Sequence, residues 1–363
     1  MGQPSNPSPK WTRPISETAK AARSRGGRES NNSVHFHRVT ERSVSLETSK
    51  SQSAFRTATP VDLVHISVCV CTFKRPVLLA DLLRGLLDQI TDGSFTYSIV
   101  VVDNDHHESG RATVEQFRGT RPNAINYFVE PEQSIALARN RAAAHATGDY
   151  VAFIDDDEVP IEHWLLKMYG ALIEFQADGV LGPVRPRFEV MPPAWALKSG
   201  VFDRPNSQEY SSGLVLHWSQ TGTGNALIQR RVFDEVEGPF NVDFASGGED
   251  VDFFRRAMSQ GNVFVWCPDA VAYETVPAER TRITFQLKRA LLRGKVSLAT
   301  LSGQPVGILK SIAACGAYTM LLPVALLFGR HVFLKYLVKN CDHLGKILAL
   351  AGIDLVGETY VTK

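Results

Sequence analysis

Hydrophobic residues change their spacing several times after residue 65, from every second position to every third or fourth. Ile66, Val68 and Val70 follow the two-residue period of a strand, and Pro76 then marks the start of a helix. The buried face of that helix is predicted to carry Leu79, Leu82, Leu83, Leu86 and Ile90. Ordered structure is therefore expected to begin at His65.

The alternation of strand and helix continues downstream. The pattern predicts a strand at 99–102, a polar helix through Glu115, a strand at 126–129, an Ala-rich helix at 134–146 and a strand at 150–154. Strands that alternate with helices favour right-handed crossovers and a mostly parallel, Rossmann-like sheet flanked by helices, which is an α/β fold. The segment 182–241 is rich in Pro and Gly, so we expect long loops and short strands there.

The first 62 residues differ from the rest. They are rich in Ser, Arg, Asn and Thr and poor in apolar residues, which predicts a disordered basic N-terminal extension over 1–62. Such an arm could touch anionic lipid or have no selected role. The start of the chain lacks the apolar run of a secretory signal peptide, so this part has no sequence reason to leave the cytoplasm.

Composition narrows the function classes. The chain has 363 residues, 44% of them hydrophobic, and a formal net charge of +1, so nothing in the overall balance points to nucleic acid. The five cysteines form no CxxC pair, which favours reduced thiols over a zinc or redox site. Cys69 and Cys71 alternate with valines and are expected to fill one face of the first strand.

Polar residues directly follow the predicted strands. The first strand ends in Thr72-Phe73-Lys74-Arg75, the second in Asp103-Asn104-Asp105 and the strand at Tyr150 in Asp155-Asp156-Asp157-Glu158. Ligands of open parallel sheets bind beyond these carboxyl ends. Four consecutive acids repel one another unless a cation offsets them, and Mg²⁺ or Mn²⁺ shared with phosphate oxygens suits such a site. Alternatively, Asp157 and Glu158 form only the acidic first turn of the next helix.

Five short motifs occur in one order along the chain: CTFKRP, VVDND, ALARNRA, GDYVAFIDDDE and GGEDVDFFRR. Together they resemble the inverting family 2 glycosyltransferases of GT-A fold, over roughly His65 to Gly294. The segments SIALARNRA, TGTGN, FASGGEDVDFFRR and FVWCPDAVAYETVP further resemble the glucosyltransferases that build succinoglycan-type bacterial exopolysaccharides. The resemblance implies a GT-A glycosyltransferase domain over 63–294 that uses a UDP-sugar.

The same resemblance implies roles for individual donor-site residues. Those implied to bind the donor are Thr72, Phe73 and Arg75 beside the nucleotide, Asp103 at the uracil, Arg139 in the donor pocket, and Asp155 with Asp156 near the ribose, while Asp157 is implied to ligate the metal. A carboxylate such as Asp103 can accept from the N3–H that uracil offers. Its alternative is a capping role after the strand.

A second acidic pair, Glu249-Asp250, follows two glycines and opens a helix. Glycines before a helix let the backbone approach a ligand closely. The resemblance implies that this pair is catalytic and that Asp250 is the base that deprotonates the acceptor hydroxyl. Taken alone, the pair could also be an exposed acidic helix cap.

The sequence departs from the family pattern after its penultimate strand. Many relatives place a His there as a metal or phosphate partner, whereas this chain has Glu274, which is a candidate for a metal or acceptor role. Arg289 and Arg293 resemble the basic element that closes over the diphosphate. They could equally form a solvated helix face.

The segment 311–329 has nineteen residues without a charge, close to the ~20 that span a bilayer. Basic residues on both sides place both flanks in the cytoplasm by the positive-inside rule, and Pro323 fits a re-entrant or interfacial hairpin. The alternative is a buried helix of the globular domain. We expect 295–363 to form a helical, membrane-associated region at the cytoplasmic face of the bacterial inner membrane.

These patterns together predict an inverting, metal-assisted transfer of a sugar, glucose by resemblance, from a UDP-sugar to a polyprenyl-diphosphate-linked saccharide. Two alternatives remain. A nucleotidyltransferase would need a Gly-rich phosphate loop after the first strand, which CTFKRP lacks. A non-catalytic membrane scaffold that binds a nucleotide sugar would not need both Asp157 and Asp250.

Overall fold

The computed structural model describes residues 63–119, 125–202, 210–244, 247–300, 305–353 and 355–356. The predicted extension 1–62 and residues 203–209 of the Pro- and Gly-rich segment lie outside the described residues.

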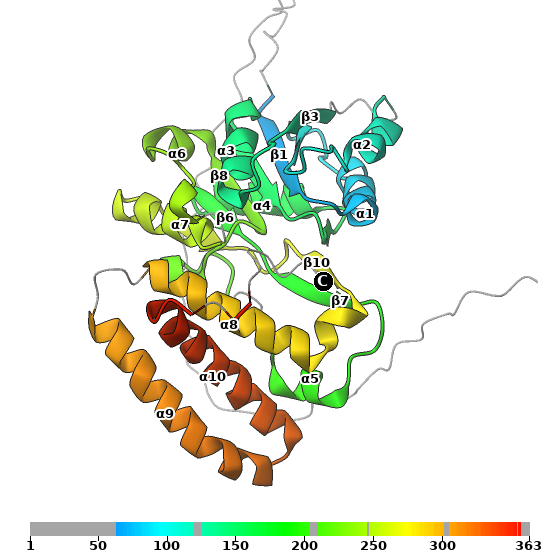
Figure 1. Ribbon diagram of the computed structural model, residues 1–363. Helices are drawn as coiled ribbons and strands as arrows, with labels where there is room; N and C mark the ends of the chain where they lie inside the picture. Colours follow the sequence, from blue (N-terminus) through cyan, green and yellow to red (C-terminus); the bar gives the residue numbers. More distant parts are fainter. Residues whose placement is uncertain are drawn as a thin grey trace, which may run out of the picture. The chain divides into compact units, whose positions relative to one another are not determined.

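Two sheets organise the described chain (Figure 1). The larger has the order β3-β2-β1-β4-β8-β6-β9, formed by β1 (His65–Thr72), β2 (Thr96–Asp103), β3 (Ile125–Val129), β4 (Tyr150–Ile154), β6 (Gly179–Leu181), β8 (Asn225–Gln229) and β9 (Phe264–Trp266). The smaller has the order β5-β10-β7, formed by β5 (Glu158–Pro160), β7 (Val184–Phe188) and β10 (Ala272–Val276). In the larger sheet, β8 alone among the described strands runs antiparallel to its neighbours.

Helices connect and cover these strands. They are α1 (Pro76–Leu87), α2 (Arg111–Phe117), α3 (Ile135–His145), α4 (Trp164–Glu174), α5 (Ala194–Ser199), α6 (Arg230–Glu235), α7 (Glu249–Ser259), α8 (Ile283–Thr300), α9 (Pro305–Leu327) and α10 (Arg330–Leu350), with short 3₁₀ turns η2 (Trp218–Gln220), η3 (Val242–Phe244) and η4 (Ala278–Thr281). The predicted α/β class, a mostly parallel sheet flanked by helices, is confirmed. The predicted buried residues Leu79, Leu82, Leu83 and Leu86 are buried on α1, whereas Ile90 lies beyond the end of the helix.

The two-residue period of the strands divides the core between the two faces of the sheet. Ile66, Val68 and Val70 of β1 pack with the leucines of α1 and with Trp164 of α4. Cys69 points to the opposite face, where it joins the alanines of α3 and the aromatic residues of α6 and α7, and Cys71 packs beside it. The sheet is therefore covered on both faces, so its functional groups gather at the strand ends.

The C-terminal helices pack side by side in the order α8, α10, α9. In Figure 1, α10 lies between α8 and α9, and it also contacts α5. Arg293 of α8 donates two hydrogen bonds to Asp342 of α10, at 3.0 and 3.1 Å. The domain boundary expected between 294 and 295 lies inside the continuous helix α8, which packs against α10.

Glycines allow this helix contact to be close. A Cβ on Gly345 would lie 2.2 Å from the carbonyl oxygen of Leu291. Gly345→Ala is therefore expected to lower stability by about 1–3 kcal/mol through overpacking of backbone against backbone. Gly170→Ala is the matched control, because a Cβ on Gly170 of α4 meets nothing within 4 Å and should be neutral or stabilising. Thermal unfolding of both variants measures the difference, and equal effects would contradict the packing argument.

The uncharged segment 311–329 lies mostly in α9, which packs against α10 on one side and is exposed on the other. Met320 and Leu327 of α9 are 80% and 85% exposed. The alternative that 311–329 is a buried helix of the domain is therefore wrong for this structure. Over Gly307–Leu327, α9 is the described helix with the length and apolarity that a bilayer crossing requires.

Candidate active site

One cavity of about 420 Å³ lies beyond the carboxyl ends of β1 and β4 and beside the first turn of α7. It is lined by Cys71, Thr72, Phe73, Arg75, Asn104, Gln133, Ile135, Arg139, Asp155, Asp156, Asp157, Gly247, Gly248, Glu249, Asp250, Glu274, Arg280, Phe285 and Arg289. Most residues that the sequence nominated are thus brought together, although they come from segments more than two hundred positions apart.

The four acids after β4 do not belong to a helix. Glu158 begins β5, and α4 starts only at Trp164, so the alternative of an acidic first helical turn is wrong. Asp155, Asp157 and Glu158 each place one carboxylate oxygen within 4.8 Å of the others. Three hard oxygen donors at this spacing fit a divalent cation such as Mg²⁺ or Mn²⁺.

Gly224 makes room for this cluster. A Cβ at that position would lie 2.9 Å from Oε1 of Glu158 and 3.1 Å from Oδ2 of Asp155. Gly224 belongs to the TGTGN segment and directly precedes β8, which pairs with β4. The absence of a side chain therefore lets the antiparallel strand approach the acids closely.

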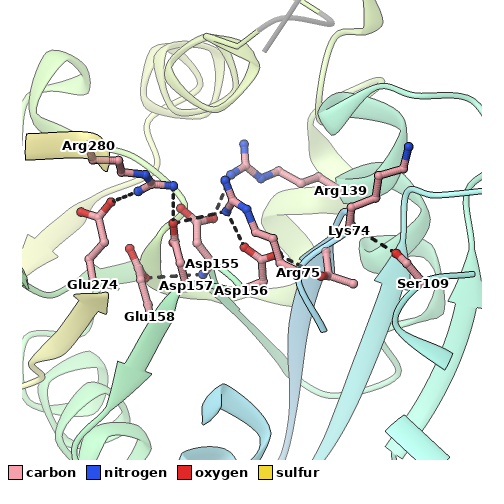
Figure 2. Close-up of polar contacts among 11 residues, drawn as sticks. Lys74, Arg75, Ser109, Arg139, Asp155, Asp156, Asp157, Glu158, Glu274 and Arg280 are labelled. Atoms are coloured by element: carbon pink, nitrogen blue, oxygen red, sulfur yellow. Dashed lines mark hydrogen bonds and ion pairs between the residues drawn. The ribbon is translucent and has the colours of Figure 1, made fainter. Parts of the chain in front are cut away.

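Asp156 faces the end of β1. Its Oδ2 accepts a hydrogen bond of 2.8 Å from the hydroxyl of Thr72, and its Oδ1 accepts one of 2.9 Å from Arg75. Burial raises the pKa of Asp156 to about 6, although Arg75 opposes the rise. Figure 2 shows Arg75 reaching both Asp156 and Asp157, so this arginine links the first motif to the acidic one.

Arg139 joins the two acidic halves of the cavity. This buried guanidinium donates to Asp155 at 3.2 Å and also pairs with Glu249 at the start of α7. Gly248, with φ of 95°, adopts the left-handed conformation that turns the chain into α7. Glu249 is itself buried, and its Oε2 has no hydrogen-bond partner among the described residues. The expectation of an exposed helix cap therefore fails for Glu249.

Asp250 is more accessible than Glu249. It lines the cavity, and its Oδ1 accepts a hydrogen bond of 2.8 Å from the backbone of Val251. A Cβ on Gly222 would lie 3.4 Å from its Oδ2, so the loop before β8 passes close to this carboxylate. An accessible carboxylate in a cavity that is also lined by the candidate cation ligands Asp155 and Asp157 has the chemistry to accept a proton from a hydroxyl bound there.

Burial raises the pKa of Glu249 from its ordinary value of 4.5 to about 7, with Arg139 opposing the rise and Asp250 adding to it. Between these two values the unfolded chain loses a proton that the folded chain keeps. The contribution of Glu249 to the free energy of unfolding is therefore fully present below about pH 4.5 and is lost as the pH rises to about 7. Glu249→Gln should remove this decline, so the gap in unfolding midpoint between variant and wild type should change across that window. A pH-independent gap would contradict the assignment.

Two nominated residues lie elsewhere. Asp103 is fully buried and does not line the cavity, because its carboxylate accepts from the backbone of Asp105 and Gly110 and from the hydroxyl of Tyr127. This geometry matches the capping alternative. It does not place the Asp103 carboxylate where a uracil base would bind in the cavity. Arg293 faces Asp342 of α10, so it ties two helices together and does not close over the cavity.

Other cavity residues were missed. Arg280 of η4 contacts Asp157 and Glu274, and Phe285 of α8 lines the cavity together with Asn104. Arg280 stands in the charged stretch Glu279-Arg280-Thr281-Arg282, where no hydrophobic period marks the inward position. The available signal was its place directly after the strand that carries Glu274.

Comparison with known proteins gives independent evidence. A family described as Glycosyl transferase family 2 matches residues 67–237. The succinoglycan biosynthesis protein ExoM of Rhizobium meliloti is 31% identical over 313 residues, 84% of this chain and 99% of the relative. Glycosyltransferase AglE of Haloferax volcanii is 24% identical over 212 residues, 58% of this chain and 66% of the relative.

Among solved structures, the chain is similar to S. aureus TarS 1-349 in complex with UDP. The identity is 15%, the TM-score is 0.47, and the match covers 82% of this chain and 98% of the other.

Proposed function

The chain belongs to glycosyl transferase family 2, and from that premise we propose that it moves glucose from UDP-glucose to a hydroxyl of a polyprenyl-diphosphate-linked saccharide in bacterial exopolysaccharide synthesis. Family membership makes it a glycosyltransferase. The name of the relative that matches over almost its whole length supports the exopolysaccharide context. The observation that carries the proposal is that Asp155, Asp156 and Asp157 after β4 line the same cavity as Asp250 of α7.

The donor lies along the strand ends in this proposal. Thr72, Phe73 and Arg75 border the nucleotide, and Asp155 and Asp156 lie on the ribose side, since all five line the cavity. Arg139 donates a hydrogen bond to Asp155, and Arg289 contributes positive charge near the diphosphate. Asp103 supports the loop after β2 through its three hydrogen bonds.

Asp157, with Asp155 and Glu158, is the proposed holder of a divalent cation. When bound, Mg²⁺ or Mn²⁺ supplies positive charge that stabilises the departing diphosphate. Glu274 is engaged by Arg280, so the extra negative charge at this position is compensated by a side chain of the same chain.

The proposed transfer is a single displacement with inversion. Asp250 accepts the proton of the acceptor hydroxyl while that oxygen forms a bond to the anomeric carbon. The bond between the anomeric carbon and the diphosphate oxygen breaks in the same step, and the electron pair leaves with UDP. Glu249 pairs with Arg139, which also pairs with Asp155, and this chain of contacts keeps the donor site aligned with Asp250.

We further propose that α9 and α10 dock the enzyme on the cytoplasmic face of the inner membrane. Exposed apolar residues of α9 such as Met320 and Leu327 would enter the interface, while Lys335 and Lys339 of α10 are exposed and would attract anionic headgroups. This position would bring a polyprenyl-linked acceptor to the cavity.

The double variant Met320→Glu and Leu327→Glu is expected to lower binding to vesicles that contain anionic lipid by about tenfold or more, because two charges replace apolar contacts. The double variant Val190→Glu and Met191→Glu is the control, since these residues are also exposed and apolar but lie before α5. Vesicle flotation with the full chain measures both. Equal loss in the two double variants would contradict docking through α9.

A donor panel tests the proposed reaction. The full chain is incubated with Mn²⁺, a lipid-linked saccharide and each of several UDP-sugars, and release of UDP is measured. Acceptor-dependent release from UDP-glucose is expected. Binding of UDP-glucose without any release would favour the non-catalytic scaffold, and pyrophosphate formation from UTP with a sugar 1-phosphate would favour a nucleotidyltransferase.

A further inference from the structure

The backbone of Arg280 is held by hydrogen bonds at both its N–H and its carbonyl. It lies in η4, between β10 and α8. Its N–H donates to the carbonyl of Pro277 at 3.0 Å, and its carbonyl accepts a hydrogen bond of 2.6 Å from Nε2 of Gln286. Gln286 is fully buried, so this anchor is rigid. Any movement at this position therefore belongs to the guanidinium.

The guanidinium of Arg280 bridges two carboxylates at the edge of the cavity (Figure 2). Its Nη2 lies 3.0 Å from Oδ2 of Asp157, and its Nη1 lies 2.9 Å from Oε1 of Glu274. The backbone fixes the carboxylates side by side, because the N–H of Thr275 donates to the carbonyl of Asp157 at 2.7 Å. Two acids that cannot separate require a positive charge between them.

Arg280 therefore pairs with the carboxylate of Asp157, which is a cation ligand in the proposed function. Oδ2 of Asp157 accepts from both Arg280 and Arg75, at 3.0 and 3.3 Å. A divalent cation that ligates this oxygen repels the nearby guanidinium, so cation and arginine compete for Asp157. Arg75 retains Asp156 as a closer partner, whereas Arg280 would keep only Glu274.

A diphosphate resolves this competition. The fork of N–H donors in a guanidinium matches phosphate oxygens, and Arg280 already lines the cavity that would hold them. We propose that Arg280 is an exchangeable counterion. It pairs with Asp157 while no cation is bound, and it pairs with the donor diphosphate when the cation binds. This inference rests on the proposed function.

Linkage makes the proposal measurable. If Arg280 gives up Asp157 to the cation and gains the diphosphate, each ligand must strengthen the binding of the other by the same factor. An arginine that serves only as a structural tie between β10 and the acidic loop would leave this coupling unchanged when it is replaced.

The test measures Mn²⁺ binding to the full chain by electron paramagnetic resonance, with and without saturating UDP. In the wild type, UDP should tighten Mn²⁺ binding by about tenfold, within the usual range of coupled sites. In Arg280→Gln, Mn²⁺ alone should bind more tightly than to the wild type, and the tightening by UDP should shrink by about fivefold. Arg231→Gln is the matched control, because Arg231 also bridges two carboxylates, Asp178 and Glu235, away from the cavity.

The outcomes separate the inference from the function on which it rests. A wild type that binds neither Mn²⁺ nor UDP would overturn the proposed function itself. Binding of both ligands with wild-type coupling in Arg280→Gln would overturn only the role of Arg280. If Arg280→Gln does not fold, Arg280→Lys replaces it: the retained charge should keep Mn²⁺ binding alone near wild type, while the lost fork should reduce the tightening by UDP. Unchanged tightening in that variant would also overturn the proposal.

Discussion

Asp250→Asn is expected to lower turnover by about 10²- to 10⁴-fold, the usual contribution of a general base, while the affinity for the UDP-sugar stays near wild type. The amide keeps the shape of the side chain and can still accept from the backbone of Val251, so α7 should begin normally. It cannot take a proton from the acceptor hydroxyl. The loss should therefore appear in the chemical step and not in donor binding.

Single-turnover transfer and equilibrium binding of UDP-glucose distinguish these effects. Asp234→Asn serves as the control, because Asp234 lies on α6 with an exposed side chain and does not line the cavity. Normal turnover combined with weakened donor binding in Asp250→Asn would make Asp250 a binding residue and would remove the proposed mechanism.

Asp157→Ala is expected to abolish transfer and the metal-dependent part of UDP binding. The substitution removes one of the three carboxylates whose oxygens lie within 4.8 Å of one another, so the proposed cation loses a ligand. It also leaves Arg75 and Arg280 without a shared partner. Because these arginines can still attract phosphate, weak UDP binding that does not depend on metal should remain.

Calorimetric titration with UDP, with and without EDTA, separates the two parts of the binding. In the wild type, EDTA should weaken binding, whereas in Asp157→Ala it should have little effect. The unfolding midpoint of the variant must be compared with that of Asp234→Asn, so that a folding defect is not mistaken for lost metal binding. EDTA-sensitive transfer near the wild-type rate would assign the cation to other ligands.

Local patterns in the sequence were enough to determine the elements around the site. The two-residue period at Ile66 to Val70, Pro76 at the start of α1 and the acids after Ile154 are each fixed by a few neighbouring residues. Ser134, the first residue of the predicted Ala-rich helix, caps α3 in the structure, since its hydroxyl accepts from the backbone of Leu137. These features depend on backbone preference and on hydrophobic faces, both of which act over one or two turns.

Only the tertiary structure decided which charges meet. The pairing of β5 with β10 sets Glu274 opposite Glu158, although 116 positions separate them along the chain. Arg280 pairs with Asp157, and Arg139 pairs with Glu249. Asp103 accepts from the backbone of Gly110, and Arg293 pairs with Asp342. A charged residue has no periodic signature, and its partner is set by sheet register and helix packing. The energy of a buried pair depends on that partner. The sequence alone therefore nominated the acids together with Arg75 and Arg139, but it gave neither their pairings nor Arg280.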